Sequence, residues 1–381
     1  MRIGLLAPSR RYEDSFLHPS EALFRASGDN LGNFAFVEAL WRHLSPEATI
    51  LPWRVTAEEA REKCDLLVFA AANQLGAHHD LGWFATHLEK MGLPIVVVGL
   101  GAQAPSMASA VQLTAGTERW VRLLAAQAPT RRPNIGVRGE FTRRALEKLG
   151  LGDSAAITGC PSNFLNDQPD FYAALKRRFD KRRIDRLAVA AGSRHFGATR
   201  DIERRLARLV EATGGAYVAQ ADLDMVRLAR GESERSEPAE RQAIREFIAP
   251  DRSAEDFELW RQRHATCFTD ATSWMEAMRG FDFAVGARFH GVMLAVQAGV
   301  PGGVIAHDSR TLELCQTTGV PVRLASEIPA DLGLADLHAL FDLDIAAFAA
   351  TRERMRRVYV DLLRGAGIEP SPRLTTLQAR A

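Results

Sequence analysis

The chain has 381 residues, of which 46% are hydrophobic and 25% are charged, and its formal net charge is +1 at pH 7. This length exceeds what one hydrophobic core ordinarily supports, so we expect two domains, and the composition excludes a disordered or fibrous protein. A charge near zero provides no overall attraction to nucleic acid or to an anionic membrane. We therefore expect no nucleic-acid partner, and any anion site must be local.

The cysteines and the N-terminal segment indicate a reduced, cytoplasmic protein. The apolar run that begins at Met1 is interrupted by Pro8 and Arg10, too early for a signal peptide, and is typical of a first strand. No apolar run approaches the ~20 residues that span a bilayer, so stable membrane insertion is not expected. The widely separated cysteines form no CxxC pair, which favours reduced, mostly buried thiols over a disulfide or zinc site: Cys64, Cys160, Cys267 and Cys315.

The first 165 residues alternate between short β-branched runs and amphipathic segments of helical period. The run at residues 95–99 is apolar on both faces, as in a parallel sheet that helices cover on both sides. We therefore expect strands joined by helices. The predicted strands are residues 3–7, 66–70, 95–99, 135–138 and 155–158, and the predicted helices are 33–43, 81–91, 118–127 and 140–149.

The alternation weakens between about residues 160 and 186, which predicts a crossing between domains, and then resumes. Residues 230–250 are highly charged, which is typical of either a mobile loop or a surface helix. The later predicted strands are 187–191, 216–219, 265–268, 281–285 and 302–306, with helices at 200–212, 254–263, 273–279, 292–298 and 309–318. The chain is thus predicted to be an α/β protein with two doubly wound Rossmann-like domains, residues 1–165 and 166–340, that face a ligand-binding cleft.

The last predicted unit is residues 341–381, with a long helix near 345–365. This helix places apolar positions such as Phe348, Met355 and Tyr359 beside a basic face. Packing on the first domain is the favoured interpretation. Peripheral contact with the inner face of a membrane is the alternative.

The segment Gly286-Ala287-Arg288-Phe289-His290-Gly291 joins an apolar strand to a helix that is apolar nearly all round, and we expect it to form the turn between them. The start of a helix offers free N–H groups and a positive dipole end, which favour phosphate or carboxylate. The alternative is an Arg288 tied to a neighbouring carboxylate and a His290 packed at a helix start. The desolvation cost of placing both beside a buried helix favours a ligand.

Arg138 occupies a similar place in the first half, at the end of a strand and before a helix that begins near Glu140. It is predicted to enter the cleft from the opposite domain, and pairing with Glu140 is the alternative. Other strand-end or loop residues could contact substrate, although helix capping explains Asp308 and the Asn-rich loop equally well. These possible substrate-binding residues are Asn30, Asn33, Gly101, Gln103, His307 and Asp308.

The sequence contains no P-loop, HExxH or GxSxG motif, and residues 99–103 supply no complete GxGxxG. His78, His79 and Asp80 are adjacent on a predicted loop and lack a further ligand at a defined spacing. We therefore predict no metal site and no cofactor.

Taken together, these segments resemble the polysaccharide pyruvyl transferases over residues 28–325. The most specific part is the Arg-x-His-Gly sequence at residues 288–291 followed by Ala-Gly-x-Pro at 298–301. The resemblance implies a GT-B-like fold and transfer of pyruvate from phosphoenolpyruvate to two hydroxyls of a sugar or glycan, with a cyclic ketal formed and phosphate released. It also implies that Arg138, Arg288 and Gly291 bind the donor and that His290 is the catalytic proton donor.

Two residues depart from the family pattern. Cys160 stands before Pro161 where the family often has Asp, and His307 stands before Asp308 where it often has Tyr. Both departures are compatible with a different acceptor or with a different reaction. The competing interpretations are a nucleotide-sugar-dependent glycosyltransferase of GT-B fold and a non-catalytic binding protein of an exopolysaccharide pathway. Neither the acceptor sugar nor the oligomeric state can be predicted from these motifs.

Overall fold

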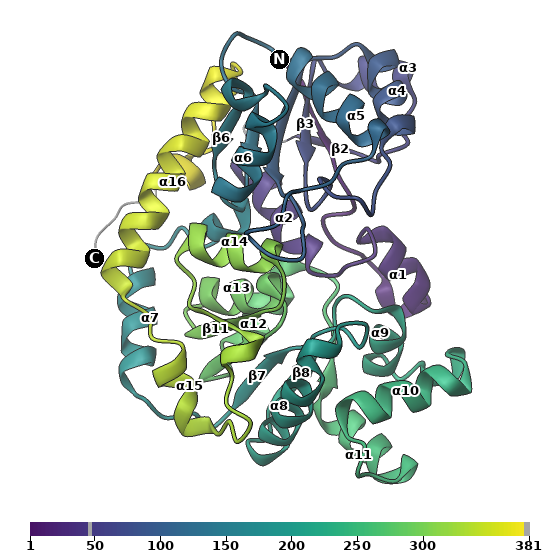
Figure 1. The fold of residues 1–381 in the computed structure, drawn as a ribbon, viewed down its shortest axis with the longest axis vertical. Coiled ribbons are helices and arrows are strands. Elements are labelled where there is room, and N and C mark those ends of the chain that lie inside the picture. Colours follow the sequence, from purple (N-terminus) through teal and green to yellow (C-terminus); the bar gives the residue numbers. More distant parts are fainter. Residues whose placement is uncertain (45–47, 377–381) are drawn as a thin grey trace.

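Two parallel sheets of six strands organise the computed structural model, which describes residues 1–44 and 48–376 (Figure 1). The first sheet has the order β2-β1-β3-β4-β5-β6 and the second the order β12-β11-β10-β7-β8-β9. The strands of the first are β1 (Ile3–Leu6), β2 (Thr49–Leu51), β3 (Leu66–Ala70), β4 (Ile95–Leu100), β5 (Ile135–Val137) and β6 (Ala155–Ile157). Those of the second are β7 (Leu187–Ala190), β8 (Ala216–Val218), β9 (Ala265–Thr266), β10 (Phe283–Gly286), β11 (Gly302–Ala306) and β12 (Val322–Leu324).

Helices bury both faces of the first sheet. Because successive side chains of a strand point to opposite faces, Ile95 and Val97 of β4 join one core cluster while Val96 and Val98 join another. The first cluster packs against α3 (Ala57–Lys63), α4 (Gly82–Met91), α5 (Ala115–Ala126) and α6 (Glu140–Glu147). The second packs against α2 (Asn33–His43), α7 (Phe171–Asp180), α13 (Phe289–Gln297), α14 (Ser309–Thr318) and α16 (Ile345–Gly365).

The second sheet is covered in the same way. Val189 and Val285 pack under one set of helices, and Ala188 and Ala284 pack under another. The first set is α8 (Arg200–Ala212), α9 (Leu223–Ala229), α10 (Pro238–Ile248), α11 (Ala254–His264) and α15 (Leu334–Leu340), and the second includes α12 (Ala271–Met278) and α13. The predicted fold class, two doubly wound Rossmann-like domains in a GT-B-like arrangement, is therefore confirmed. The residue bounds of the domains stay predictions.

The long helix α16 runs along both halves of the molecule (Figure 1) and contacts β5, β6, α7 and α14. The side chain of its Arg352 is buried and donates hydrogen bonds to the carbonyl of Asn163 at 2.7 Å and to the Tyr172 hydroxyl at 3.2 Å. This arginine thereby ties α16 to the segment in which the chain passes from the first sheet to the second. Within the described residues, every helix is too short or too polar to cross a bilayer.

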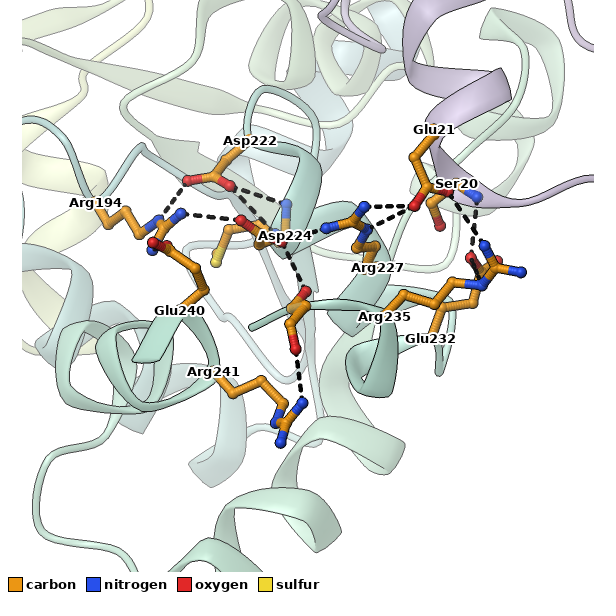
Figure 2. A network of polar contacts seen from close by, with 12 residues as sticks. Ser20, Glu21, Arg194, Asp222, Asp224, Arg227, Glu232, Arg235, Glu240 and Arg241 are labelled. Carbon is orange, nitrogen blue, oxygen red and sulfur yellow. Dashed lines mark hydrogen bonds and ion pairs between the residues drawn. The ribbon is translucent and has the colours of Figure 1, made fainter. Parts of the chain in front are cut away.

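A group of charged side chains joins the two halves on another side, and we call it the α1–α9 network (Figure 2). Glu21 of α1 (Ser20–Ala26) accepts a hydrogen bond from Arg227 Nε of α9 at 3.1 Å, and the Ser20 N–H donates to Glu232 at 3.0 Å. Arg227 also pairs with Asp224 at 2.7 Å. The labelled members of the network are Ser20, Glu21, Arg194, Asp222, Asp224, Arg227, Glu232, Arg235, Glu240 and Arg241.

Several elements differ from the sequence-based expectation. The helix predicted from residue 292 begins three residues earlier, at Phe289 of α13, so the expected turn at residues 286–291 is shorter than predicted. Its backbone turns helical directly after Arg288, which has extended dihedral angles. The charged stretch 230–250 contains the helix α10. The elements that the sequence pattern did not predict are β2, β12, α1, α3, α7, α9, α15 and α17 (Pro372–Thr375).

Candidate active site

The connection from β10 to α13 depends on close backbone packing. A Cβ atom on Gly286 would lie 2.2 Å from the carbonyl oxygen of Ala190 in β7, and one on Gly291 would lie 2.7 Å from the Ala190 side chain. Only glycine therefore lets the head of α13 pack onto the end of β7. All nine residues of α13 are buried. Gly291 thus shapes the site through packing, while Arg288 and His290 present their side chains to it.

A cavity of about 80 Å³ lies where segments of both domains meet, beyond the carboxyl ends of β5 and β10. It brings together five residues that the sequence singled out, which are Asn30, Asn33, Arg138, Arg288 and His290. The other lining residues are Ala72, Asn73, Gln220, Ala287, Phe289, Arg310, Thr311 and Leu314. Cationic and amide side chains dominate this lining, so the cavity suits a ligand that carries both negative charge and hydroxyl groups.

Arg138 enters the cavity from the end of β5. Its side chain is buried, and its Nε donates a hydrogen bond to the carbonyl of Gly99 at 2.9 Å. A Cβ atom on Gly101 would lie 2.7 Å from Arg138 Cδ, so this glycine makes room for the arginine. Glu140 pairs instead with Arg143 at 2.8 Å, and the alternative interpretation of an Arg138–Glu140 pair is wrong.

Arg288 enters from the second domain, and its Nε makes no hydrogen bond to any residue that the structure describes. Burial lowers its pKa to about 10, and the neighbouring Arg310 adds to this shift. The nearby Glu203 is fully buried, accepts hydrogen bonds from the Gly192 N–H and the Tyr217 hydroxyl, and has a pKa that burial raises to about 7. Its carboxyl is therefore no strong counter-charge, and Arg288 remains available to an anion.

Arg310, in the first turn of α14, is a third cation of the cavity that the sequence reasoning missed. Its Nη2 lies 2.9 Å from Oδ2 of Asp308, whose other oxygen accepts from the Thr311 N–H at 2.8 Å and caps the helix. Its position four residues after the end of β11 is the signal that could have identified it, because ligands gather at the carboxyl ends of parallel strands.

His290 is almost fully buried between the two domains. Its ring centroid lies 5.5 Å from that of Phe36 in α2, and its Nε2 lies 3.4 Å from the sulfur of Cys160. Burial, together with the positive charges of Arg138 and Arg310, lowers the pKa of His290 to about 3. The imidazole is therefore neutral near pH 7 until an anion offsets those charges.

The amide residues differ in how much hydrogen-bonding capacity they retain. Asn30 accepts from the Gly32 N–H at 2.9 Å, and Asn33 donates to the carbonyl of Ser27 at 2.9 Å, so both help to fold their own loop. Gln220 is 2% exposed, and its Oε1 has no partner in the described structure. Gln220 follows β8 in a loop with no motif, so nothing in the sequence marked it.

Besides Gly101, three predicted substrate-binding residues do not line the cavity: Gln103, His307 and Asp308. Gln103 accepts a hydrogen bond from Asn73, which does line the cavity. His307 packs against Phe196 with ring centroids 4.4 Å apart, and Asp308 holds Arg310. These residues act on a ligand only through their neighbours in this arrangement.

In the described part of the chain, no group of three or more His, Cys, Asp or Glu side chains is placed to hold a metal ion. His78 and His79 have ring centroids 4.2 Å apart, and Nε2 of His78 lies 3.1 Å from the carbonyl oxygen of Asn73. All four cysteines are unpaired, and three of them are buried.

Comparison with known proteins gives one family match. Residues 30–309 match the family model described as polysaccharide pyruvyl transferase. No curated protein matches the sequence. Among solved structures, the S. aureus MnaA-UDP co-structure is similar to this chain, with 12% identity and a TM-score of 0.47. The match covers 97% of this chain and 99% of the MnaA chain. A UDP-N-acetylglucosamine 2-epimerase from Rickettsia bellii has 9% identity and a TM-score of 0.48, with coverage of 96% and 95%.

Proposed function

Since the chain belongs to the polysaccharide pyruvyl transferase family, we propose that it transfers pyruvate from phosphoenolpyruvate to two hydroxyls of a sugar or glycan. The observation that carries this proposal is the placement of Arg138 and Arg288, which come from opposite domains, beside His290 in one cavity. Phosphoenolpyruvate carries a carboxylate and a phosphate, and two guanidinium groups can bind both with paired hydrogen bonds. Arg310 adds a third positive charge to the same wall.

The charge of the proposed donor also explains how His290 obtains its proton. In the free protein, burial and the arginine charges hold the pKa of His290 at about 3. A bound anion offsets those charges and raises the pKa, because a nearby negative charge favours the imidazolium. Donor binding therefore loads the acid, and the imidazole remains neutral when the site is empty.

The proposed reaction balances with His290 as the proton donor. The imidazolium protonates the methylene carbon of phosphoenolpyruvate, C2 becomes electrophilic, and the first sugar hydroxyl forms a C–O bond there. His290 regains a proton from that hydroxyl. The C2–O bond to phosphate then breaks, the second hydroxyl attacks C2, and its proton leaves with the phosphate. General acid catalysis of this type typically contributes ~10²–10⁴-fold in rate.

The amide groups of the cavity suit the proposed acceptor. Asn30, Asn73 and Gln220 are neutral hydrogen-bonding side chains, which match sugar hydroxyls better than a second anion. The proposed donor is a cytoplasmic metabolite, and the four unpaired thiols fit that compartment. We place the enzyme in the synthesis of a cell-surface glycan such as an exopolysaccharide.

The proposal is tested by incubating the protein in D₂O with phosphoenolpyruvate labelled with ¹³C at C3 and a panel of nitrophenyl and lipid-linked sugars. We expect phosphate release that depends on one sugar, and a ketal methyl group in the product that carries deuterium at one position. Transfer of a glycosyl group from a nucleotide sugar, with no ketal signal for any acceptor, would contradict pyruvyl transfer.

A further inference from the structure

The side chain of Cys160 lies directly behind the imidazole of His290. Cys160 follows β6 and precedes the 3₁₀ turn η3 (Pro161–Phe164), and 1% of the residue is exposed. Its sulfur lies 3.4 Å from Nε2 of His290 and 3.0 Å from the hydroxyl oxygen of Ser162. The histidine therefore belongs to the second domain, and Cys160, which follows a strand of the first domain, contacts its ring.

A protonated Cys160 has a hydrogen that it can donate to Nε2 of His290. Burial raises the pKa of the thiol more than Arg138 and the hydrogen bonds with Ser162 lower it, so the sulfur keeps its proton near pH 7. A neutral imidazole has one N–H donor and one acceptor nitrogen. When the S–H donates to Nε2, that nitrogen is the acceptor, and the ring proton must be on Nδ1.

The remaining surroundings of the ring leave Nδ1 free. Three arginines face the same cavity: Arg138 at the end of β5, Arg310 on α14 and Arg288 at the head of α13. A guanidinium group carries only hydrogen-bond donors, so none of them can accept a hydrogen bond from Nδ1. Phe36 of α2 covers the ring with an apolar side chain. Nδ1 makes no hydrogen bond to any residue that the structure describes, and His290 lines the cavity.

We infer that Cys160 is a positioning residue that holds His290 in the Nδ1–H tautomer, so that Nδ1 is the nitrogen that exchanges a proton with the substrate. This inference rests on the proposed function of His290. When the ring takes up its second proton on donor binding, that proton binds Nε2, so the contact with the sulfur reverses in the imidazolium and stays reversed after Nδ1 has protonated the donor. Ser162, at 3.0 Å from the same sulfur, is placed to accept the S–H in that state.

The test is ¹⁵N NMR of the free, full-length protein labelled at its 10 histidines, with the His290 signals assigned by their loss in His290→Gln. We expect His290 to be protonated on Nδ1 in the unmodified protein and in Cys160→Ser, whose hydroxyl also donates. Cys160→Ala should shift the ring to the Nε2–H form. The buried Cys64 is remote from the cavity, so Cys64→Ala is the matched control and should leave the His290 signals unchanged.

Two results would overturn the inference. One is an Nε2–H tautomer of His290 in the unmodified protein, and the other is an unchanged tautomer in Cys160→Ala. Turnover provides the second measurement: Cys160→Ala should lower kcat by about tenfold, the effect of losing roughly one hydrogen bond, with KM for phosphoenolpyruvate unchanged and activity largely restored in Cys160→Ser. Because the NMR measurement needs no substrate, it stands or falls separately from the proposed reaction.

Discussion

Two groups of buried or partly buried arginines have opposite surroundings. In the α1–α9 network (Figure 2), Arg194 lies 2.9 Å from Asp222 and 3.1 Å from Asp224, and also contacts Glu240. In the cavity, Arg138 donates to one backbone carbonyl, and Nε of Arg288 has no partner among the described residues. Burying a charge without a partner is costly, so we expect loss of an arginine from the first group to destabilise the fold and the second group to bind an anion, as proposed.

The pKa shifts follow the same division. Burial lowers the pKa of Arg194, but the hydrogen bonds with Asp222 and Glu240 outweigh it, and the net pKa is raised. For Arg288 burial dominates, and the pKa falls to about 10. Within the described residues Arg288 forms no ion pair, and this difference from Arg194 supports the cavity as the proposed ligand site.

The largest effect is expected for His290→Ala. Loss of the proposed acid should lower kcat by ~10²–10⁴-fold, and donor affinity should change little because the arginines remain. Phosphate release under donor saturation measures this change. His338 is also buried but contacts Phe283 in the second domain, and His338→Gln is the control that should retain turnover. Near-normal turnover of His290→Ala would rule out its catalytic role.

The next effect is expected for Arg288→Gln. Removal of one charged donor should weaken phosphoenolpyruvate binding by roughly 10–100-fold, since a hydrogen bond between charged groups contributes about 1.5–3 kcal/mol. The same change removes an uncompensated buried charge, so the free energy of unfolding without ligand should stay the same or rise. Calorimetric titration measures the donor affinity, and urea unfolding measures the free energy of unfolding. A clear loss of stability with unchanged donor affinity would place Arg288 in the structural group.

Arg194→Gln should give the reverse result. It leaves Asp222 and Asp224 short of a counter-charge and should lower the free energy of unfolding by about 2 kcal/mol, while donor affinity stays near that of the unmodified protein. Arg144→Gln provides a control, because Arg144 is exposed and pairs with Glu140 only at 3.5 Å. Donor binding that falls as far in Arg194→Gln as in Arg288→Gln would remove the distinction between the two groups.

The smallest expected effect is the uptake of a proton when the donor binds. His290 has a pKa of about 3 in the free site and is neutral above that value. If the bound donor raises this pKa toward or above the working pH, binding takes up a proton. Calorimetry in two buffers of different ionisation enthalpy measures the uptake near pH 8, where a phosphate with a pKa of about 6 is already deprotonated. His290→Gln should lose this uptake, and an equal uptake in both proteins would contradict donor-loaded protonation.

The sequence predicted the parts of the molecule that depend on regular periodicity. Strands such as β3 and β4 are apolar on both faces, and Arg138, Arg288 and His290 were found because they follow such strands. The edge strands β2 and β12 have three residues each, too few for a pattern to emerge. Gln220 was missed because the amide side chains reach the cavity from loops that follow separate strands, and no sequence pattern links such loops. Arg310 was missed because capping of a helix by Asp308 already explained its segment.

The central claim is that the unpaired arginines of the cavity form the donor site. Calorimetric titration of the unmodified protein and of an Arg138→Gln, Arg288→Gln double variant with phosphoenolpyruvate tests it most directly, with a nucleotide sugar as the comparison ligand. We expect the unmodified protein to bind phosphoenolpyruvate and the double variant, still folded, to lose that binding. Unchanged phosphoenolpyruvate affinity in the double variant, or binding of the nucleotide sugar alone, would contradict the assignment.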